Sequence, residues 1–154
     1  MALLLNTDDY RRKARRRLPR GLFDYIDRGT EDECAVRALR RSLDGVRLSP
    51  RILTGHGARD MRTELFGDTL SMPVAVSPTA LAGMCAYDGE AKLARVAARA
   101  GIPFCVATQS VTTVEEVRAG APDAKLWFQL YVWKDRALTA ALLDRVKACD
   151  VSTL

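Results

Sequence analysis

The sequence predicts an α/β fold with parallel strands. From residue 73 onward, three short apolar runs of strand length alternate with helical segments, and a fourth apolar run begins at Val151. Continuous apolar strands separated by helices are typical of parallel βα units, because helices cover such a sheet and bury its strands. The predicted elements are strand Pro73–Ser77, helix Gly89–Ala100, strand Pro103–Thr108, helix Thr113–Gly120, strand Leu126–Val132 and helix Asp135–Ala148.

Such units close either as a doubly wound open sheet or as an eightfold barrel. The turn after the first strand, Pro78–Gly83, has neither the GxGxxG nor the GxxxxGK(S/T) motif that would favour the open sheet. Polar residues instead follow the strands, at the carboxyl ends where barrels hold their chemistry. They are Ser77, Thr79, Thr108, Gln109, Ser110, Gln129 and Tyr131. These units make up under half of the roughly 250 residues of a complete barrel, so we expect the N-terminal part of one.

The residues before the barrel divide into two segments. Residues 1–45 carry three helical patterns, and residues 46–72 form an irregular lead-in with one hairpin. Pro19 suits a helix start, whereas Gly29 and Asp44-Gly45 suit helix ends. The helices are expected at Thr7–Arg17, Pro19–Arg28 and Asp32–Leu43, and the hairpin strands at Arg62–Phe66 and Thr69–Met72 about a Gly67-Asp68 turn.

The composition is that of a soluble globular protein. The 154 residues are 48% hydrophobic and 28% charged. No apolar run approaches the roughly 18 residues that span a membrane, and the N-terminus lacks the basic start and long apolar core of a secretory signal, so we expect a cytoplasmic protein. The four cysteines form no CxxC pair, and the single histidine, His56, lies in a predicted loop, so neither a zinc site nor a disulfide framework is expected.

The positive charge is concentrated near the N-terminus. Residues 1–51 hold 13 Lys and Arg against 8 Asp and Glu, which accounts for the whole net charge of +5, and seven of these basic residues lie in Arg11–Arg20. Such a cluster could bind nucleic acid or an anionic membrane surface. A solvated helix face is the simpler interpretation, because no aromatic residues alternate with the arginines and no nucleic-acid-binding motif accompanies them.

The third strand carries polar side chains within an apolar run. Side chains alternate along a strand, so Gln129 and Tyr131 are expected to point the same way. A buried strand that directs an amide and a phenol into one space offers hydrogen bonds to a ligand, because unpaired polar groups are costly to bury.

Other short motifs run along nearly the whole chain. They are Leu18-Pro19, Phe23-Asp24-Tyr25, Gly29–Glu33, Pro50–Leu53, Ser71–Pro73, Ser77–Ala80, Gly89-Glu90 with Ala97-Ala98 and Gly101, and Trp127–Tyr131. In this order and spacing, residues 8–154 resemble the FMN-dependent α-hydroxy acid oxidases and dehydrogenases. That family includes glycolate oxidase, the flavin lactate dehydrogenase and mandelate dehydrogenase.

The resemblance implies a TIM barrel with FMN at its C-terminal mouth. The backbone of residues 78–80 would lie against the flavin ring, and the amide of Gln129 would bind the pyrimidine edge, which both donates and accepts hydrogen bonds. Where family members usually carry a hydroxyl residue that contacts the flavin, this chain has Ala107, and Thr108 or Gln109 would compensate through the loop. The expected cofactor-binding residues are Pro78, Thr79, Ala80, Thr108 and Gln129.

The resemblance also implies a substrate site. Tyr131 would contact the substrate oxygen, and Tyr25 would help to bind the substrate carboxylate. The family's histidine base, arginines and lysine would lie beyond Leu154, and His56 matches no catalytic position, so no catalytic residue is expected in this chain. The implied reaction oxidises a small L-2-hydroxy acid of the lactate, glycolate or mandelate type, with hydride transfer to flavin N5 and electrons passed on to oxygen, a quinone or another carrier.

Several alternatives stay open. By itself the chain is expected to be inactive and to bind flavin weakly, and an unpaired sheet edge would favour a non-catalytic half-barrel remnant or a self-associating module. A nucleic-acid binder acting through Arg11–Arg20 is less favoured. The family includes tetrameric and membrane-peripheral members, so the resemblance also implies a homo-oligomer and leaves room for peripheral membrane association.

Overall fold

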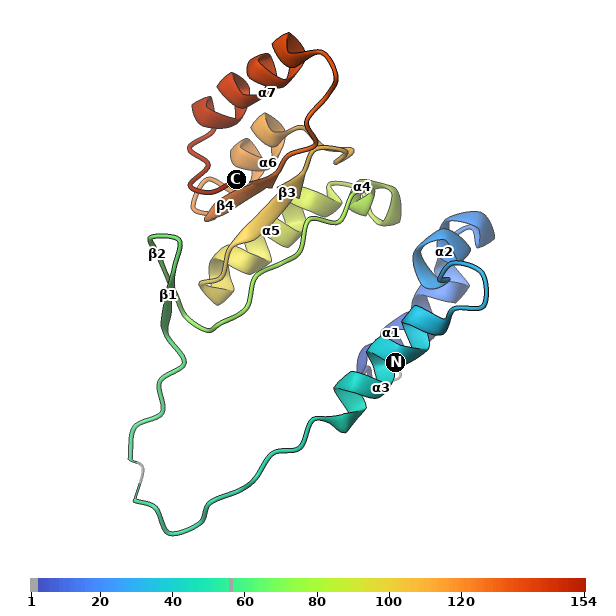
Figure 1. Cartoon of the computed structure of the whole chain (residues 1–154), viewed down its shortest axis with the longest axis vertical. Helices are drawn as coiled ribbons and strands as arrows, with labels where there is room; N and C mark the ends of the chain where they lie inside the picture. Colours follow the sequence, from blue (N-terminus) through green and yellow to red (C-terminus); the bar gives the residue numbers. More distant parts are fainter. Residues whose placement is uncertain (1–2, 56) are drawn as a thin grey trace. The chain divides into compact units, whose positions relative to one another are not determined.

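The chain forms two compact units, Met1–His56 and Gly57–Leu154 (Figure 1). The computed structural model describes residues 3–55 and 57–154, so the expected loop position of His56 lies outside the described residues. The first unit is helical, and the strands belong to the second.

The first unit contains helices whose bounds were largely predictable. Its helix α1 begins after Asn6, whose side chain accepts a hydrogen bond from the N–H of Asp9, and the acidic first turn and basic last turn suit the helix dipole. Phe23 of the next helix is buried. The predicted helices are confirmed with ends shifted by at most two residues, because the second starts after Pro19 and the third continues through Gly45. Their bounds are α1 (Thr7–Arg17), α2 (Arg20–Asp27) and α3 (Cys34–Gly45).

An antiparallel hairpin opens the second unit. Its strands are β1 (Thr63–Leu65) and β2 (Asp68–Leu70). The residues between them, Phe66 and Gly67, have positive φ angles of 50° and 83°, as in the type I′ turn that suits the twist of hairpin strands. The predicted hairpin is confirmed, but its turn lies one residue earlier than expected, because Asp68 pairs with Leu65 and so belongs to the strand.

The main sheet of the second unit is parallel. It contains β3 (Phe104–Ala107) and β4 (Leu126–Gln129), which pair directly. Val76 forms a parallel bridge to β3, and Thr153 forms one to β4. The strand segments therefore follow one another in chain order, without the reversal that marks a doubly wound sheet. Such an order is what a β/α barrel requires.

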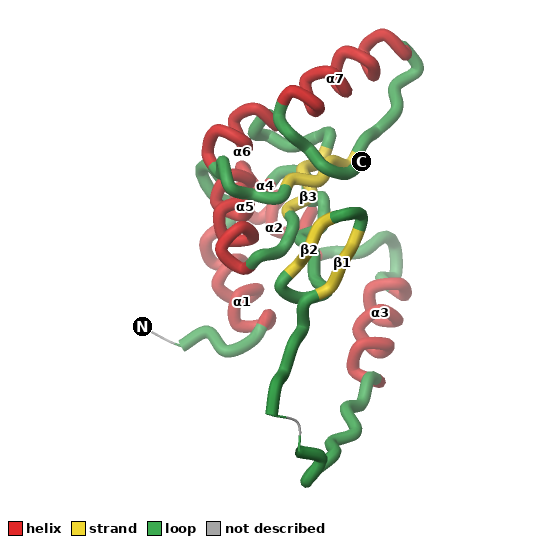
Figure 2. Tube along the Cα trace, turned by 90° about the vertical axis from the view of Figure 1, so that its left-hand side faces the viewer, coloured by secondary structure: helices red, strands yellow, loops and turns green. Residues whose placement is uncertain are grey.

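Helices cover one face of this sheet. The helices α5 (Gly89–Ala100), α6 (Val114–Gly120) and α7 (Arg136–Ala148) follow the successive strands, and α5 and α6 lie side by side on the same side of them (Figure 2). The core includes Phe104, Val106, Leu126 and Phe128, which are alternate residues of the two strands. Both predicted ends of α5 are confirmed, and Gly101 closes it in the left-handed conformation that glycine adopts without strain.

The hairpin lies at the amino ends of the strands. The backbone N–H of Ser71 donates to the carbonyl of Gly101, just before β3, at 2.9 Å. At the start of β4, the Trp127 indole donates to Asp68 at 2.9 Å, and its ring meets Phe66 edge to face at 5.5 Å between centroids. The carboxyl ends of β3 and β4 are therefore the ends away from the hairpin.

The predicted first strand, Pro73–Ser77, is wrong in extent. Only Val76 forms a bridge, donating to the carbonyl of Pro103 at 2.9 Å and accepting from Cys105 at 3.0 Å. Pro73 has no backbone N–H to donate to a neighbouring strand. On the side of the segment away from β3, no described residue pairs with it. The one-turn helix α4 (Ala82–Cys85) was not predicted, because four residues are too few to show a helical period.

Candidate cofactor and substrate site

Gln129 ends β4 on the face of the sheet away from the helices. In the parallel register it lies beside Ala107 of β3, whereas the adjacent residues Val106 and Phe128 point into the core. Gln129 is half-buried, and its side-chain amide forms no hydrogen bond to any residue in the described ranges. Because one amide both donates and accepts, Gln129 suits the edge of a heterocycle that has both kinds of group.

Thr108 connects the carboxyl ends of the two strands. Its hydroxyl donates to the backbone carbonyl of Gln129 at 2.5 Å and accepts from the backbone N–H of Tyr131 at 2.9 Å. The N–H of Thr108 donates to the same Gln129 carbonyl at 3.0 Å. Since the hydroxyl hydrogen is directed at the backbone, the oxygen has only acceptor capacity left for a bound group.

Tyr131 lies beyond the end of β4, with 54% of its surface exposed. The prediction of a strand that continues to Val132 is wrong, because the N–H of Tyr131 bonds to the Thr108 hydroxyl instead of a neighbouring strand. The alternation of a regular strand therefore fixes the face of Gln129 but not that of Tyr131.

The turn that contains Pro78, Thr79 and Ala80 lies at the same end of the sheet. Val76 runs parallel to β3, so these residues follow the first strand segment at its carboxyl end. The N–H of Thr79 donates to the Ser77 carbonyl at 2.9 Å. Pro78 and Thr79 are exposed and Ala80 is half-buried. The fold thus brings this turn, Thr108 and Gln129 to the edge where barrels bind ligands.

Glu90, in the first turn of α5, holds two loops of this edge. Its side chain is fully buried and accepts hydrogen bonds from the Thr112 hydroxyl at 2.8 Å and the Val111 N–H at 3.3 Å. Burial alone would raise the pKa of Glu90, but the hydrogen bonds from Thr112 and from backbone groups that include Gly83 and Val111 outweigh burial and lower that pKa. The carboxylate therefore connects the loop that contains α4 with the loop after β3.

The role of Glu90 was not predicted from the sequence, although Gly89-Glu90 belongs to the motifs that indicate the family. A glutamate in the first turn of a helix is ordinarily a solvated residue that favours the helix dipole. Its burial depends on loops that come from other parts of the chain, so no local pattern indicates it.

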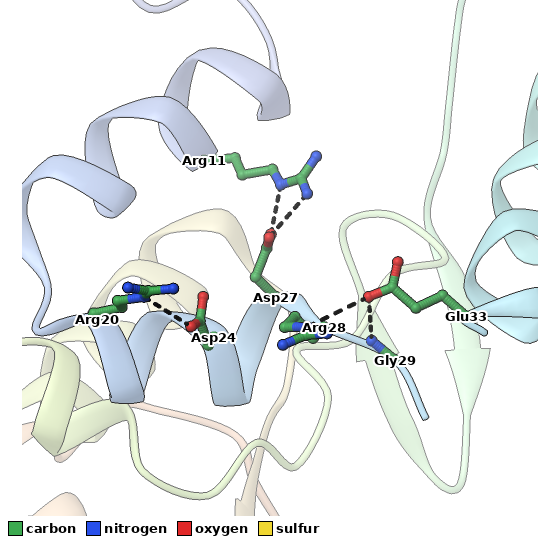
Figure 3. Close-up of polar contacts among 7 residues, drawn as sticks. All are labelled: Arg11, Arg20, Asp24, Asp27, Arg28, Gly29 and Glu33. Atoms are coloured by element: carbon green, nitrogen blue, oxygen red, sulfur yellow. Dashed lines mark hydrogen bonds and ion pairs between the residues drawn. The ribbon is translucent and has the colours of Figure 1, made fainter. Parts of the chain in front are cut away.

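Tyr25 belongs to the first unit, where it is 73% exposed on α2. The helix that carries it is held to α1 by Arg11, whose guanidinium binds both carboxylate oxygens of Asp27 at 2.5 and 2.8 Å (Figure 3). The hydrogen bonds from Arg11 lower the pKa of Asp27. After α2, the Glu33 carboxylate accepts from the N–H of Gly29 at 3.3 Å.

Comparison with known protein families shows to which family the chain belongs. A family model described as FMN-dependent dehydrogenase matches residues 14–154. The chain belongs to this family. The resemblance stated from the motifs is therefore confirmed, and FMN is the cofactor on which the family depends.

A curated sequence relative and two solved structures resemble the chain, and the solved structures confirm the fold class. An L-lactate dehydrogenase of Pseudomonas syringae pv. syringae (strain B728a) is 45% identical over 152 residues, which are 99% of this chain and 40% of that protein. A mutant of an active chimera of (S)-mandelate dehydrogenase is 36% identical with a TM-score of 0.89, over 97% of this chain and 42% of that one. A second (S)-mandelate dehydrogenase, described as a monotopic membrane protein, is 33% identical with a TM-score of 0.88, over 97% of this chain and 40% of that one.

The chain spans about two fifths of the length of the curated relatives it matches. Its βα units correspond to the N-terminal part of the TIM barrel of these FMN-dependent enzymes, as predicted.

The residues at the carboxyl edge fit a flavin. Within residues 57–154, the half-buried side-chain amide of Gln129 makes no hydrogen bond to the protein, and the buried hydroxyl of Ser110 in the loop after β3 has no partner. Polar groups left without partners at the mouth of a barrel are what a bound polar ring satisfies. When bound, FMN supplies the hydride-accepting chemistry.

The basic cluster near the N-terminus is partly neutralised by neighbouring acids. Arg11 pairs with Asp27, Arg12 with Asp9, and Arg20 with Asp24 at 3.6 Å. The Arg11 and Arg20 pairs appear in Figure 3. Separately, none of the helices in residues 3–55 and 57–154 is both long and apolar enough to cross a membrane.

Proposed function

We propose that this chain is the N-terminal part of an FMN-dependent dehydrogenase that oxidises a small L-2-hydroxy acid to the 2-oxo acid. L-Lactate is the first substrate to test, because the relatives that are 45–47% identical to the chain over 146–152 aligned residues are L-lactate dehydrogenases. The observation that carries the proposal is the unpartnered amide of Gln129 at the carboxyl end of β4, in a chain of this family.

Each residue of the edge has a proposed task. Gln129 binds the pyrimidine edge of the flavin, and the backbone at Pro78, Thr79 and Ala80 lies against the ring. Tyr131 contacts the substrate oxygen. On the first unit, Tyr25 helps to bind the carboxylate. Ala107 lies beside Gln129 in the register but has no hydroxyl to add a flavin hydrogen bond.

The test of the proposal is the affinity for FMN, measured in the complete protein as the cell makes it. Gln129→Met keeps the length of the side chain but removes the amide, so the dissociation constant for FMN should rise by about tenfold. Ala107→Ser adds a hydroxyl beside Gln129, and the constant should fall by up to about tenfold. Fluorescence quenching of FMN measures the dissociation constant of each variant. Thr69→Val in the hairpin is the control, and it should leave that constant unchanged.

Unchanged affinity in Gln129→Met would contradict the assignment of the flavin edge to Gln129. Unchanged affinity in Ala107→Ser would show that Ala107 causes no deficit in flavin binding. Neither result depends on turnover, so the cofactor site is tested separately from the choice of substrate.

The 154 residues by themselves are proposed to be inactive, because the family resemblance implies that the base, the arginines and the lysine correspond to none of their positions. Oxidation of L-lactate, glycolate or L-mandelate by residues 1–154 with added FMN would contradict this. A stable, defined oligomer without FMN binding would instead favour the self-associating module.

Peripheral membrane association is proposed for the complete protein, since one relative is a monotopic membrane protein. A quinone or another carrier is then the proposed electron acceptor, and a homo-oligomer the proposed assembly. Sedimentation with anionic vesicles, with and without Arg15→Gln and Arg16→Gln, tests the association. Protein that stays in the supernatant at low salt would contradict it.

A further inference from the structure

The side chain of Thr108 binds the backbone of two other residues, Gln129 and Tyr131. One hydroxyl donates to the carbonyl of Gln129 at 2.5 Å and accepts from the N–H of Tyr131 at 2.9 Å. These two partners are the last residue of β4 and a residue beyond it. The hydroxyl therefore connects the two positions that the proposed function gives to the flavin edge and to the substrate.

The bond to Tyr131 is made where the sheet no longer holds the chain. Up to Gln129, the backbone of β4 is held by β3 through the parallel ladder. After Gln129, the N–H of Tyr131 has the Thr108 hydroxyl as its acceptor, and Tyr131 itself is 54% exposed. Exposed backbone held by a single side chain opens more readily than backbone held in a ladder.

The bond to Gln129 is supported twice. Both the hydroxyl and the backbone N–H of Thr108 donate to the Gln129 carbonyl, at 2.5 and 3.0 Å. Loss of the hydroxyl would leave the backbone bond and hence the end of the ladder in place. It would release mainly the residues from Leu130 to Tyr131.

We propose that Thr108 is a positioning residue that fixes the backbone of Tyr131 relative to Gln129, and so sets the substrate contact relative to the flavin contact. This inference rests on the proposed function for the roles of Tyr131 and Gln129. It assigns Thr108 to the protein backbone and not to direct flavin binding, since the hydroxyl hydrogen points at the Gln129 carbonyl.

Two substitutions separate a positioning role from a flavin ligand. Thr108→Val keeps the branched shape and removes the hydroxyl, whereas Thr108→Ser keeps the hydroxyl. In the complete protein with FMN at saturation, Thr108→Val should raise KM for L-lactate about tenfold and lower kcat less, and Thr108→Ser should restore KM to within about twofold of the wild type. The dissociation constant for FMN should change by less than about threefold in either variant.

A double-mutant cycle with Tyr131→Phe tests whether the effect passes through Tyr131. If it does, Thr108→Val should add little to the KM of Tyr131→Phe, because coupled residues are not additive. Additive effects, or an FMN affinity that falls as in Gln129→Met with KM unchanged, would overturn the proposal. Thr69→Val, which removes a hydroxyl that donates to Glu64 at 2.6 Å in the hairpin, is the matched control.

Amide hydrogen exchange gives a readout that needs no turnover. The N–H of Tyr131 should exchange at least about tenfold faster in Thr108→Val than in the wild type or Thr108→Ser. Equal exchange rates would overturn the positioning role. Faster exchange in a protein that neither binds FMN nor oxidises a hydroxy acid would confirm the backbone contact and refute the proposed function, so the two failures are distinguishable.

Discussion

Glu90 and Gln129 show how single residues acquire their properties in this fold. Gln129 faces away from the core because the strand alternates, so its orientation follows from its position in β4. Glu90 is buried because two loops close over the first turn of α5, and hydrogen bonds from these loops stabilise its charge. The first property could be predicted from the sequence, and the second could not.

Glu90→Gln should destabilise the protein at neutral pH. The amide nitrogen of glutamine would face groups that donate to the carboxylate, and an unmatched buried polar group costs about 1–3 kcal/mol. The pKa of Glu90 is held below its ordinary 4.5, so its stabilising contribution is present above that value and is lost as pH falls through the lower pKa of the folded state.

Urea unfolding at a series of pH values measures this difference. The stability gap between wild type and Glu90→Gln should be largest near neutral pH and should shrink below about pH 4.5. Glu31→Gln, at an exposed position of the first unit, is the control. A gap that is absent at neutral pH, or that grows in acid, would show that Glu90 is not held as a carboxylate.

Among the elements, those with a strong local signal were predicted well. The capping box of Thr113 and Glu116 begins α6, and Gly101 ends α5, so both helices have ends that the sequence specifies. The end of β4 was missed because a side chain, Thr108, replaces the ladder as partner of the next N–H. That contact joins residues 23 apart in the chain and has no local pattern.

The amino-terminal edge of the sheet depends on Arg118 of α6. Its guanidinium donates to four backbone carbonyls, those of Cys149, Pro122, Ala124 and Asp150, at 2.8–2.9 Å. These carbonyls lie in the loop before β4 and in the turn after α7. One planar group thus connects α6, α7 and the start of β4.

Arg118→Lys should lower the free energy of unfolding by about 1–3 kcal/mol, although the charge is kept. An ammonium group is a compact charge and does not reproduce the fork of donors that contacts the four carbonyls. Chemical denaturation measures the change, with the exposed Arg99→Lys as control. Equal stability of the two variants would contradict this role of Arg118.

For the whole molecule, family membership links two units that the structure describes separately. The family match covers residues 14–154 and therefore includes most of the helical unit with Tyr25 and all of the unit with Gln129. In the sequence, the absence of GxGxxG and P-loop motifs disfavoured a doubly wound sheet, and the other motifs indicated the family. The strand segments, which follow one another in chain order, agree with a barrel. What the sequence could not indicate is the distribution of hydrogen bonds at the carboxyl edge, since these join loops that are distant in the chain.

Anaerobic mixing of the complete FMN-loaded protein with L-lactate, followed by flavin absorbance, tests directly whether this protein is a flavin-dependent hydroxy acid dehydrogenase. L-Lactate should bleach the flavin and D-lactate should not, and Gln129→Met should need about tenfold more FMN to give the same response. A protein that retains no FMN, or whose bound flavin is unaffected by L-lactate, glycolate and L-mandelate alike, would contradict the proposed function.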